Sequence, residues 1–203
     1  MEPATSLRER KKAATRLALH RAVVELAAAK GLDAVTVDAV ADHANVSRRT
    51  FSNYFANKEE ALLYGERTRY ERLIAALRAR PANETPWQAL TRSVQVLVDA
   101  IAELDPVWIA QMRVVRRHPS LAPHQMALHC AVESELVTEI LERLRSQQAS
   151  SDPVADLLRA RVIAGTFLAA LRAAITVWID RQETLSIADV VDAALRTAAE
   201  RFR

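Results

Sequence analysis

The stretch from Thr36 to Glu60 reads TVDAVADHANVSRRTFSNYFANKEE. Its pattern predicts a short helix, a tight turn, a second short helix and the capped start of a third. Two short helices joined by a turn are a common way to place one helix in the major groove of DNA. This stretch therefore predicts function as well as fold.

Small polar residues mark the ends of these helices. Thr36 is expected to cap the first helix and Ser47 the second, because a side-chain oxygen can accept a free backbone N–H there. Both are also expected to contact DNA. Ser186 is expected to cap the last helix of the chain. Asn45 can take the left-handed conformation that ends a helix without glycine. Asn57 with Glu60 three residues later is a capping-box pattern for the following helix.

The second short helix has two different faces. Phe51 and Phe55 lie four residues apart and form its inward face. The outward face has hydrogen-bonding side chains and no acid, and consists of Arg48, Arg49, Thr50, Ser52, Asn53 and Tyr54. Such side chains bind base edges and phosphates. An ordinary helical corner shares the hydrophobic pattern, so the outward face is what favours DNA binding.

Basic residues elsewhere in the N-terminal part support this prediction. Lys11 and Lys12 belong to one basic face of the preceding helix. Lys58 begins the helix after the corner, where a cation is mildly unfavourable against the helix dipole unless an anion such as a DNA phosphate is near. Residues 5–58 contain ten basic and five acidic residues, and the rest of the chain is slightly acidic. A basic head on a near-neutral body is typical of a DNA-binding protein.

The whole chain is predicted to be all-α. It has 203 residues with only three glycines, and no segment alternates between apolar and polar residues as a strand would. The predicted helices span about 7–29, 37–45, 48–55, 58–78, 86–104, 106–117, 123–146, 153–181 and 187 to the C-terminus.

A family resemblance follows from residues of the quoted stretch, which are Thr36, Val37, Ala41, Val46, Ser47, Thr50, Phe51, Tyr54, Phe55, Asn57, Lys58 and Glu59. They resemble the N-terminal signature of TetR-type (tetracycline-repressor-like) transcriptional regulators, over about residues 8–64. Asn45 replaces the usual glycine, and Phe51 and Ser52 replace the usual leucine and tyrosine, which leaves the operator sequence open. The resemblance implies a helix-turn-helix DNA-binding domain at 1–57 and a ligand-binding and dimerisation domain at 58–203.

The last two helices are expected to form the dimer interface. Small residues recur every four positions at Gly165, Ala169 and Ala173 and would let two helices approach closely. The last helix offers Val190, Val191, Ala194 and Leu195. The resemblance implies a four-helix bundle between subunits, which would place two DNA-reading helices about 34–36 Å apart on a palindromic operator.

The resemblance also implies a pocket for a small-molecule effector in the middle of the chain. Apolar candidates for its lining are Trp108, Met112, Phe167, Leu171 and Trp178, although such a stripe is also typical of plain core. Arg113 and Arg116 would bind a phosphate or carboxylate head group, and exposed arginines on a solvated face are the alternative. The stretch QMRVVRRHPSL at 111–121 is similar to TetR-type domains that take acyl-CoA-like ligands.

Other classes of protein are disfavoured. The sequence lacks glycine-rich phosphate loops and nucleophile elbows, so neither an enzyme nor a cofactor is expected. His118, His124, His129 and Cys130 have no common metal-ligand spacing, so no metal site is predicted. A single cysteine suits a reducing cytoplasm. The apolar run 162–179 contains Arg172 and is expected to be buried in protein, with no membrane partner.

The sequence therefore predicts a cytoplasmic, homodimeric DNA-binding regulator, with repression released by a small apolar or amphipathic ligand. The alternative from another class is a helical ligand carrier or enzyme whose head does not read DNA sequence. An activator would have the same sequence features, because activation and repression differ in where the operator lies.

Overall fold

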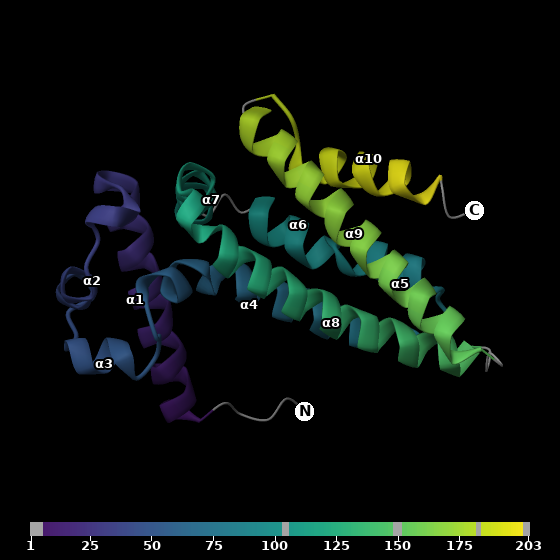
Figure 1. Cartoon of the computed structure of the whole chain (residues 1–203), viewed down its shortest axis with the longest axis horizontal. Helices are drawn as coiled ribbons and strands as arrows, with labels where there is room; N and C mark the ends of the chain where they lie inside the picture. Colours follow the sequence, from purple (N-terminus) through teal and green to yellow (C-terminus); the bar gives the residue numbers. More distant parts are fainter. Residues whose placement is uncertain (1–5, 103–105, 148–151, 182–183, 201–203) are drawn as a thin grey trace. The chain divides into compact units, whose positions relative to one another are not determined.

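The computed structural model describes residues 6–102, 106–147, 152–181 and 184–200. These residues form helices and no strands, which confirms the predicted all-α class (Figure 1). In chain order the elements are α1 (Leu7–Lys30), η1 (Leu32–Ala34), α2 (Val37–His43), α3 (Arg48–Ser52), α4 (Lys58–Arg78), α5 (Pro86–Ser93), α6 (Gln95–Ala102), α7 (Pro106–Arg117), η2 (Pro119–Leu121), α8 (Ala122–Gln147), α9 (Pro153–Arg181) and α10 (Ile187–Ala199).

Most of the predicted helix boundaries follow from local capping chemistry. The hydroxyl of Thr36 accepts the N–H of Ala39 at 3.2 Å, and that of Ser47 accepts the N–H of Thr50 at 3.0 Å. Asn45 has a φ of 53°, the left-handed conformation predicted for the turn. These three residues define the ends of the two helices and the turn between them through local contacts.

Three local predictions are wrong in detail. The carboxylate of Glu60 accepts the N–H of Ala56 and not that of Asn57, although Asn57 caps the helix as predicted. Ser186 precedes α10 but its side chain makes no capping hydrogen bond. The single helix predicted over 86–104 is interrupted at Val94, whose carbonyl accepts an i+3 hydrogen bond and tightens the turn; Leu104 lies outside the described residues.

The chain packs as two compact units. Unit 1 comprises residues 1–68 and 106–126, and unit 2 comprises residues 69–105 and 127–203. The sequence predicts two domains that are each continuous in the chain and meet at residue 57. Unit 1 is instead made of two segments, because it also contains α7 and the starts of α4 and α8. Two helices, α4 and α8, therefore have residues in both units.

Unit 1 has one core that the helix-turn-helix shares with α7. Leu19 of α1, Phe51 of α3, Leu62 of α4 and Val114 of α7 are among its buried members, and Leu121 of η2 completes it. Helix α7 lies against α1 (Figure 1). Helix α7 therefore belongs to the same packed core as the DNA-facing helices.

A glycine of α4 permits close packing in this core. A Cβ on Gly65 would lie 2.6 Å from Nε2 of His20 and 3.0 Å from Oε1 of Gln111, both of which are buried. Nδ1 of His20 donates a hydrogen bond to the carbonyl of Ala61, 2.9 Å away. A side chain larger than hydrogen at 65 would force the side chains of His20 and Gln111 to shift.

Two side chains from outside the short helices hold the η1 turn. The ammonium of Lys58 donates to the carbonyls of Leu32 and Val35 at 2.8 and 2.9 Å. Nε2 of His118 accepts the N–H of Leu32 at 3.3 Å. The turn that leads into α2 is therefore fixed by the start of α4 and by the end of α7.

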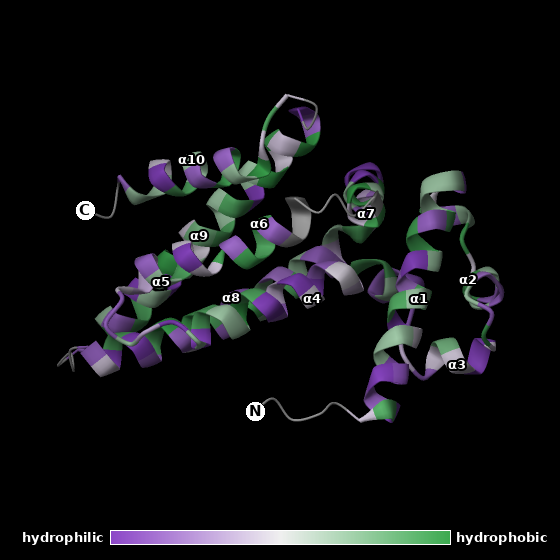
Figure 2. Cartoon of the chain, turned by 180° about the vertical axis from the view of Figure 1, so that it is seen from behind, coloured by the Kyte–Doolittle hydropathy of each residue, from purple (hydrophilic) through white to green (hydrophobic). Residues whose placement is uncertain are grey.

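Unit 2 is built around α9. One face of this helix is buried along its length and consists of Ala160, Ile163, Ala164, Phe167, Leu171, Ala174 and Trp178. Helix α10 lies along α9 and also contacts α6, and α5 contacts α9 (Figure 1). Figure 2 shows hydrophobic and hydrophilic residues alternating along α10, as expected for a helix with one buried face.

The α4–α5 connection in unit 2 is closed by a charged network. Arg143 of α8 donates to the carbonyls of Leu77 and Arg80, each at 3.2 Å, at the end of α4. Glu84 is buried and accepts hydrogen bonds from Arg80 and Arg92. The hydrogen bond from Arg80 lowers the pKa of Glu84 to about 2, against the opposing effect of burial.

The internal role of Lys58 predicts a loss of stability when its charge is removed. Lys58→Met keeps the stem and deletes the ammonium, so two backbone carbonyls lose their donor. We expect the free energy of unfolding to fall by about 1–3 kcal/mol, measured by urea denaturation. Lys12→Met, at an exposed position of α1, is the control and should leave stability unchanged. Equal midpoints for both variants would contradict the role.

The lowered pKa of Glu84 predicts a pH-dependent contribution to stability. Its unfolded-state pKa is about 4.3, so the ionised form stabilises the fold above that pH. This contribution is lost as the pH falls through the folded-state pKa of about 2. The difference in urea midpoint between wild type and Glu84→Gln should therefore be largest at neutral pH and shrink below pH 5. Glu135→Gln, on the exposed face of α8, should show no such trend.

Candidate nucleic-acid interface

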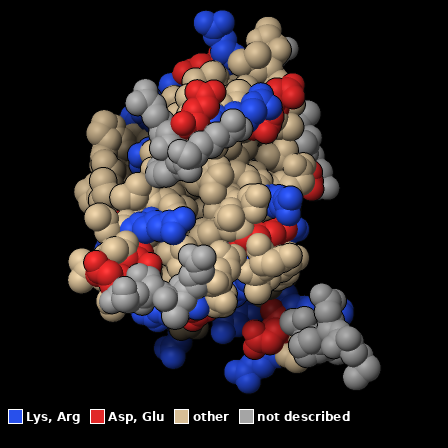
Figure 3. Space-filling view, turned by 90° about the vertical axis from the view of Figure 1, so that its right-hand side faces the viewer, with Lys and Arg blue, Asp and Glu red and all other residues tan. Residues whose placement is uncertain are grey.

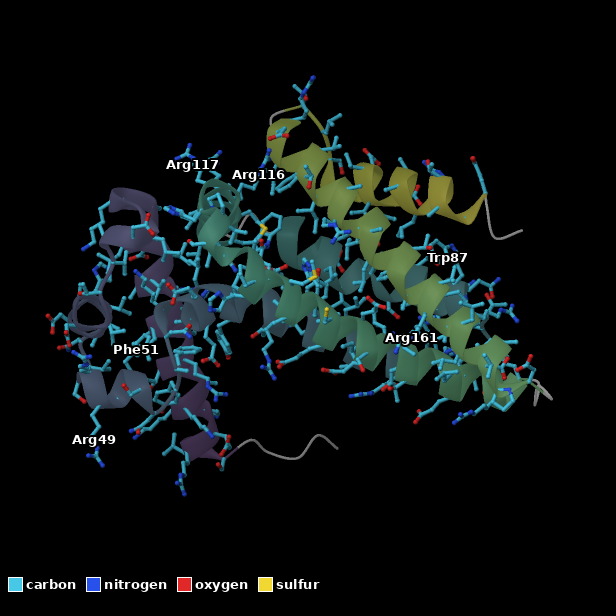
Figure 4. All side chains as sticks on the ribbon, in the orientation of Figure 1. Arg49, Phe51, Trp87, Arg116, Arg117 and Arg161 are labelled. Atoms are coloured by element: carbon cyan, nitrogen blue, oxygen red, sulfur yellow. The ribbon has the colours of Figure 1, made fainter. Side chains whose placement is uncertain are left out.

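Helix α3 is held from inside and open on the outside. Phe51 and Phe55 are buried at 1% and 4% exposure, and their rings lie 5.9 Å apart between centroids. Arg49 and Asn53 are exposed. In Figure 4, Phe51 points into unit 1, whereas Arg49 extends from α3 into solvent. The polar face predicted from the sequence is therefore available to a partner.

The polar side chains of this face are positioned by contacts within unit 1. The hydroxyls of Ser47 and Thr50 lie 2.8 Å apart. The guanidinium of Arg16 lies over the ring of Tyr54, with 5.8 Å between its Cζ and the ring centroid. Such contacts restrict rotamers before DNA arrives, which reduces the entropy lost on binding. Thr36 and Ser47, both predicted to contact DNA, lie exposed at the starts of α2 and α3.

The N-terminal part of α1 and helix α3 enclose an open groove of about 750 Å³. Its lining combines the two predicted sets of DNA contacts and consists of Leu7, Arg8, Glu9, Lys11, Lys12, Thr15, Thr50, Asn53 and Tyr54. Figure 2 shows that this part of α1 is mostly hydrophilic. The structure therefore brings Lys11 and Lys12 to the same surface as α3, although the sequence separates them by some forty residues.

Four residues of this groove were not among the predicted DNA contacts, namely Leu7, Arg8, Glu9 and Thr15. Arg8 and Thr15 lie on the groove wall with Lys11 and Lys12. The signal for Arg8 was present in the sequence, because it precedes Lys11 and Lys12 by three and four positions. Thr15 has no such signal, and its place follows only from the packing of α1 beside α3.

The structure gives Lys58 a role inside unit 1 that the sequence did not predict. Its side chain is partly buried, and the ammonium is occupied by the carbonyls of Leu32 and Val35. Two of the three N–H donors of the ammonium are used in this way, and a contact of Lys58 with a phosphate stays a prediction. The sequence argument from the helix dipole missed this internal role, because backbone carbonyls twenty-three and twenty-six residues away supply the compensating negative charge.

The residues predicted to bind the effector fall in different units. On α7, in unit 1, Trp108 is buried, Met112 is half-buried, and Arg113 and Arg116 are exposed. Arg116 and Arg117 extend from α7 in Figure 4. The other three candidates are Phe167, Leu171 and Trp178, which are core residues of unit 2. Their shared role in one pocket remains a prediction.

Unit 2 has two surface grooves beside Trp87, a residue that the sequence analysis did not assign to a site. One groove, of about 430 Å³, lies between the start of α5 and α9 and is lined by Leu158 and Val162. The other, of about 480 Å³, lies between α5–α6 and α10 and includes Val98. The ring of Trp87 packs edge-on against Phe167 and is labelled in Figure 4. The sequence predicted the start of a helix at Pro86. It did not predict the two grooves, because these form only where α5 packs beside α9 and α10.

The predicted dimer residues divide into surface and core. Ala169 and Ala173 are exposed, and a Cβ on Gly165 would meet no atom within 4 Å. In contrast, Val191 and Leu195 are buried at 2% and 5% exposure within unit 2. These two predictions need correction, because Ile187, Val191 and Leu195 form the stripe that packs α10 onto α9 and α6. Val190 and Ala194 are half-buried.

Other kinds of site find little support in the described part of the chain. No three His, Cys, Asp or Glu side chains there converge as a metal site would require. Cys130 is exposed. Helix α9 is long and apolar enough to span a membrane, but core helices of soluble proteins pass the same test. On the face drawn in Figure 3, charges of both signs are interspersed with uncharged side chains, unlike the basic groove beside α3.

Comparison with known proteins agrees with this geometry. Residues 19–64 match the family described as bacterial regulatory proteins, tetR family, and residues 84–203 match the MftR C-terminal domain. The chain is 33% identical over 184 residues to the HTH-type transcriptional regulator TcmR of Streptomyces glaucescens, covering 88% of this chain and 79% of that protein.

Solved structures share the fold. FadR of Thermus thermophilus, a TetR-family repressor in complex with lauroyl-CoA, has a TM-score of 0.56 and 23% identity, over 91% of this chain and 93% of that one. SmeT, the repressor of a Stenotrophomonas maltophilia multidrug efflux pump, has a TM-score of 0.61 and 16% identity, over 92% and 89%. From its two matching regions and its similarity to TcmR, the chain belongs to the tetR family of bacterial regulatory proteins.

Proposed function

We propose that this protein is a cytoplasmic repressor that binds a palindromic operator as a homodimer and leaves it when a small apolar or amphipathic ligand binds. The observation that carries the proposal is the surface shared by α3 and the N-terminal part of α1. It presents exposed Arg49 on α3 and places Asn53 in one groove with Lys11 and Lys12, and buried phenylalanines fix its orientation. A carrier or enzyme with an inactive head would have no use for such a face.

Within this surface the side chains have different tasks. Arg49 and Asn53 project from α3, where arginine can pair with guanine and asparagine with adenine in the major groove. Lys11 and Lys12 line the α1 wall of the groove, where a phosphate backbone would pass. The first pair is expected to read sequence, and the second to supply affinity without reading it.

The proposed operator can be found by selection in vitro, before any regulated gene is identified. Wild-type protein selects duplexes from a random-sequence library, and the recovered sequences are aligned. We expect two inverted half-sites with centres about 34–36 Å apart, one turn of DNA. Recovery of no common sequence would overturn the proposal of sequence-specific binding, and a single half-site would overturn the palindrome.

The division of tasks gives the first prediction for this site. Arg49→Ala or Asn53→Ala should relax preference at one base position, costing about 1–3 kcal/mol on the selected duplex and much less on random DNA. Lys12→Ala should instead weaken binding to both duplexes and reduce the salt slope by about one. Fluorescence anisotropy over a range of salt concentrations measures both effects. Arg21→Ala, an exposed arginine elsewhere on α1, is the control, and equal losses for every variant would contradict the assigned roles.

The open face of α9 supports the homodimer. Ala169 and Ala173 lie on the side of this helix opposite its buried stripe, and Leu158 and Val162 extend the same face with 63% and 46% exposure. A long apolar face of this kind is typical of a surface that a partner covers. We propose Gly165, Ala169, Ala173, Val190 and Ala194 as interface residues, without the buried Val191 and Leu195.

This interface predicts a charge-sensitive dimer. Ala169→Glu places a carboxylate in the proposed contact and should give a monomer at micromolar concentration by light scattering, with weaker operator binding. Ala131→Glu, at an exposed position of α8, is the matched control and should remain dimeric. A dimeric Ala169→Glu variant with normal DNA binding would exclude this face as the interface.

An acyl-CoA is the proposed class of effector. The FadR structures with lauroyl-CoA and stearoyl-CoA share this fold, and α7 carries exposed Arg113 and Arg116 that could pair with phosphates. Half-buried Met112 lies on the same helix and suits an acyl chain. Release of the selected duplex by lauroyl-CoA, but not by coenzyme A or laurate alone, would support the class; triclosan, which SmeT binds, is the comparison for a compact apolar ligand.

The proposed coupling uses connections inside the chain. Helix α7 shares the core of unit 1 with the DNA-facing helices, and α4 runs from that core to the Glu84 network of unit 2. A ligand that binds one arrangement of these helices more tightly would shift the population of recognition-helix positions and lower operator affinity. If saturating ligand leaves operator affinity unchanged, this coupling is wrong.

A further inference from the structure

The two adjacent arginines at the start of α3 differ in their surroundings. Nη1 of Arg48 donates to both carboxylate oxygens of Asp38, at 2.9 and 3.3 Å, across the corner between α2 and α3. Arg49 makes no ion pair with the residues that the structure describes, and it points into solvent in Figure 4. Only one of the two is held by an acid.

Asp38 is placed on a surface where an acid is unfavourable for DNA binding. It lies in the first turn of α2, where the helix dipole stabilises its negative charge. Its side chain is 59% exposed, and that of Arg48 is 69% exposed. A DNA phosphate that reached this corner in a non-specific complex would meet the carboxylate of Asp38. Repulsion between like charges at an interface disfavours such complexes.

The pair is weak enough to respond to DNA. Exposed ion pairs contribute about 0–1 kcal/mol, so Asp38 restricts Arg48 without locking it. The pair uses Nη1 alone, and in the described part of the chain Nη2 and Nε of Arg48 have no other partner. These two nitrogens can donate to a base edge while Nη1 stays on Asp38.

We propose that Asp38 is a specificity-determining residue of the DNA-binding surface, which positions Arg48 for a base edge and withholds it from the phosphates of random DNA. The inference rests on the proposed DNA-binding function. A free arginine binds any phosphate and adds affinity that carries no sequence information. An arginine held by a carboxylate keeps its remaining N–H donors pointing in one direction. It therefore adds affinity only for a duplex that has a hydrogen-bond acceptor in that direction.

The test compares the selected duplex with a random duplex of equal length. Asp38→Asn should tighten binding to random DNA by roughly three- to tenfold and steepen its salt dependence by about one charge. Binding to the selected duplex should change less than about twofold, so the ratio of the two affinities falls. Asp42→Asn removes the same charge from the exposed end of α2 and should change the two affinities by equal small factors.

The double variant separates positioning from a general charge effect. In an Arg48→Ala background, Asp38→Asn should no longer alter the ratio of affinities. An unchanged ratio for Asp38→Asn, or the same change with and without Arg48, overturns the proposal. If Asp38→Asn unfolds, Asp38→Ser, which keeps a polar group in the first turn of α2, replaces it. A wild type that does not distinguish the duplexes overturns the proposed function instead.

Discussion

The DNA-facing surface depends on the anchoring of α3 by two phenylalanines. A helix of five residues cannot persist alone, because nucleation costs more than its few hydrogen bonds return. Phe51 and Phe55 attach it to the core, and the ring of Phe55 also packs at 5.5 Å against Tyr64 of α4. Since these two rings face inward, Arg49, Ser52 and Asn53 are exposed, so packing determines which residues DNA can reach.

A second group of contacts ties this small motif to the rest of unit 1. Lys58 and His118 hold the η1 turn from α4 and α7, and Gly65 lets α4 approach buried His20 and Gln111. The sites of ligand binding and DNA binding in such a regulator must communicate through packed elements with alternative arrangements. Here α7 belongs to the core of the DNA-binding unit, and His118, which directly follows α7, accepts a hydrogen bond from Leu32 of the η1 turn.

Helix α9 has two sides with different surroundings. Its large residues, such as Phe167 and Trp178, are buried in the core of unit 2, whereas Ala169 and Ala173 lie on the exposed side. This explains why the helix is apolar around most of its circumference, a composition that also meets the length and hydropathy of a membrane span. A second subunit covering the exposed side would account for the apolar character without a membrane.

The sequence by itself determined the features that arise from local chemistry. The caps at Thr36, Ser47 and Asn57, the left-handed Asn45 and the inward phenylalanines follow from residues within a few positions of each other, so helix bounds and the polar face of α3 were predictable. Tertiary structure decided the long-range partners. Lys58 donates to two backbone carbonyls, Arg48 pairs with Asp38, and Leu195 is buried, because each depends on which distant group packing brings near.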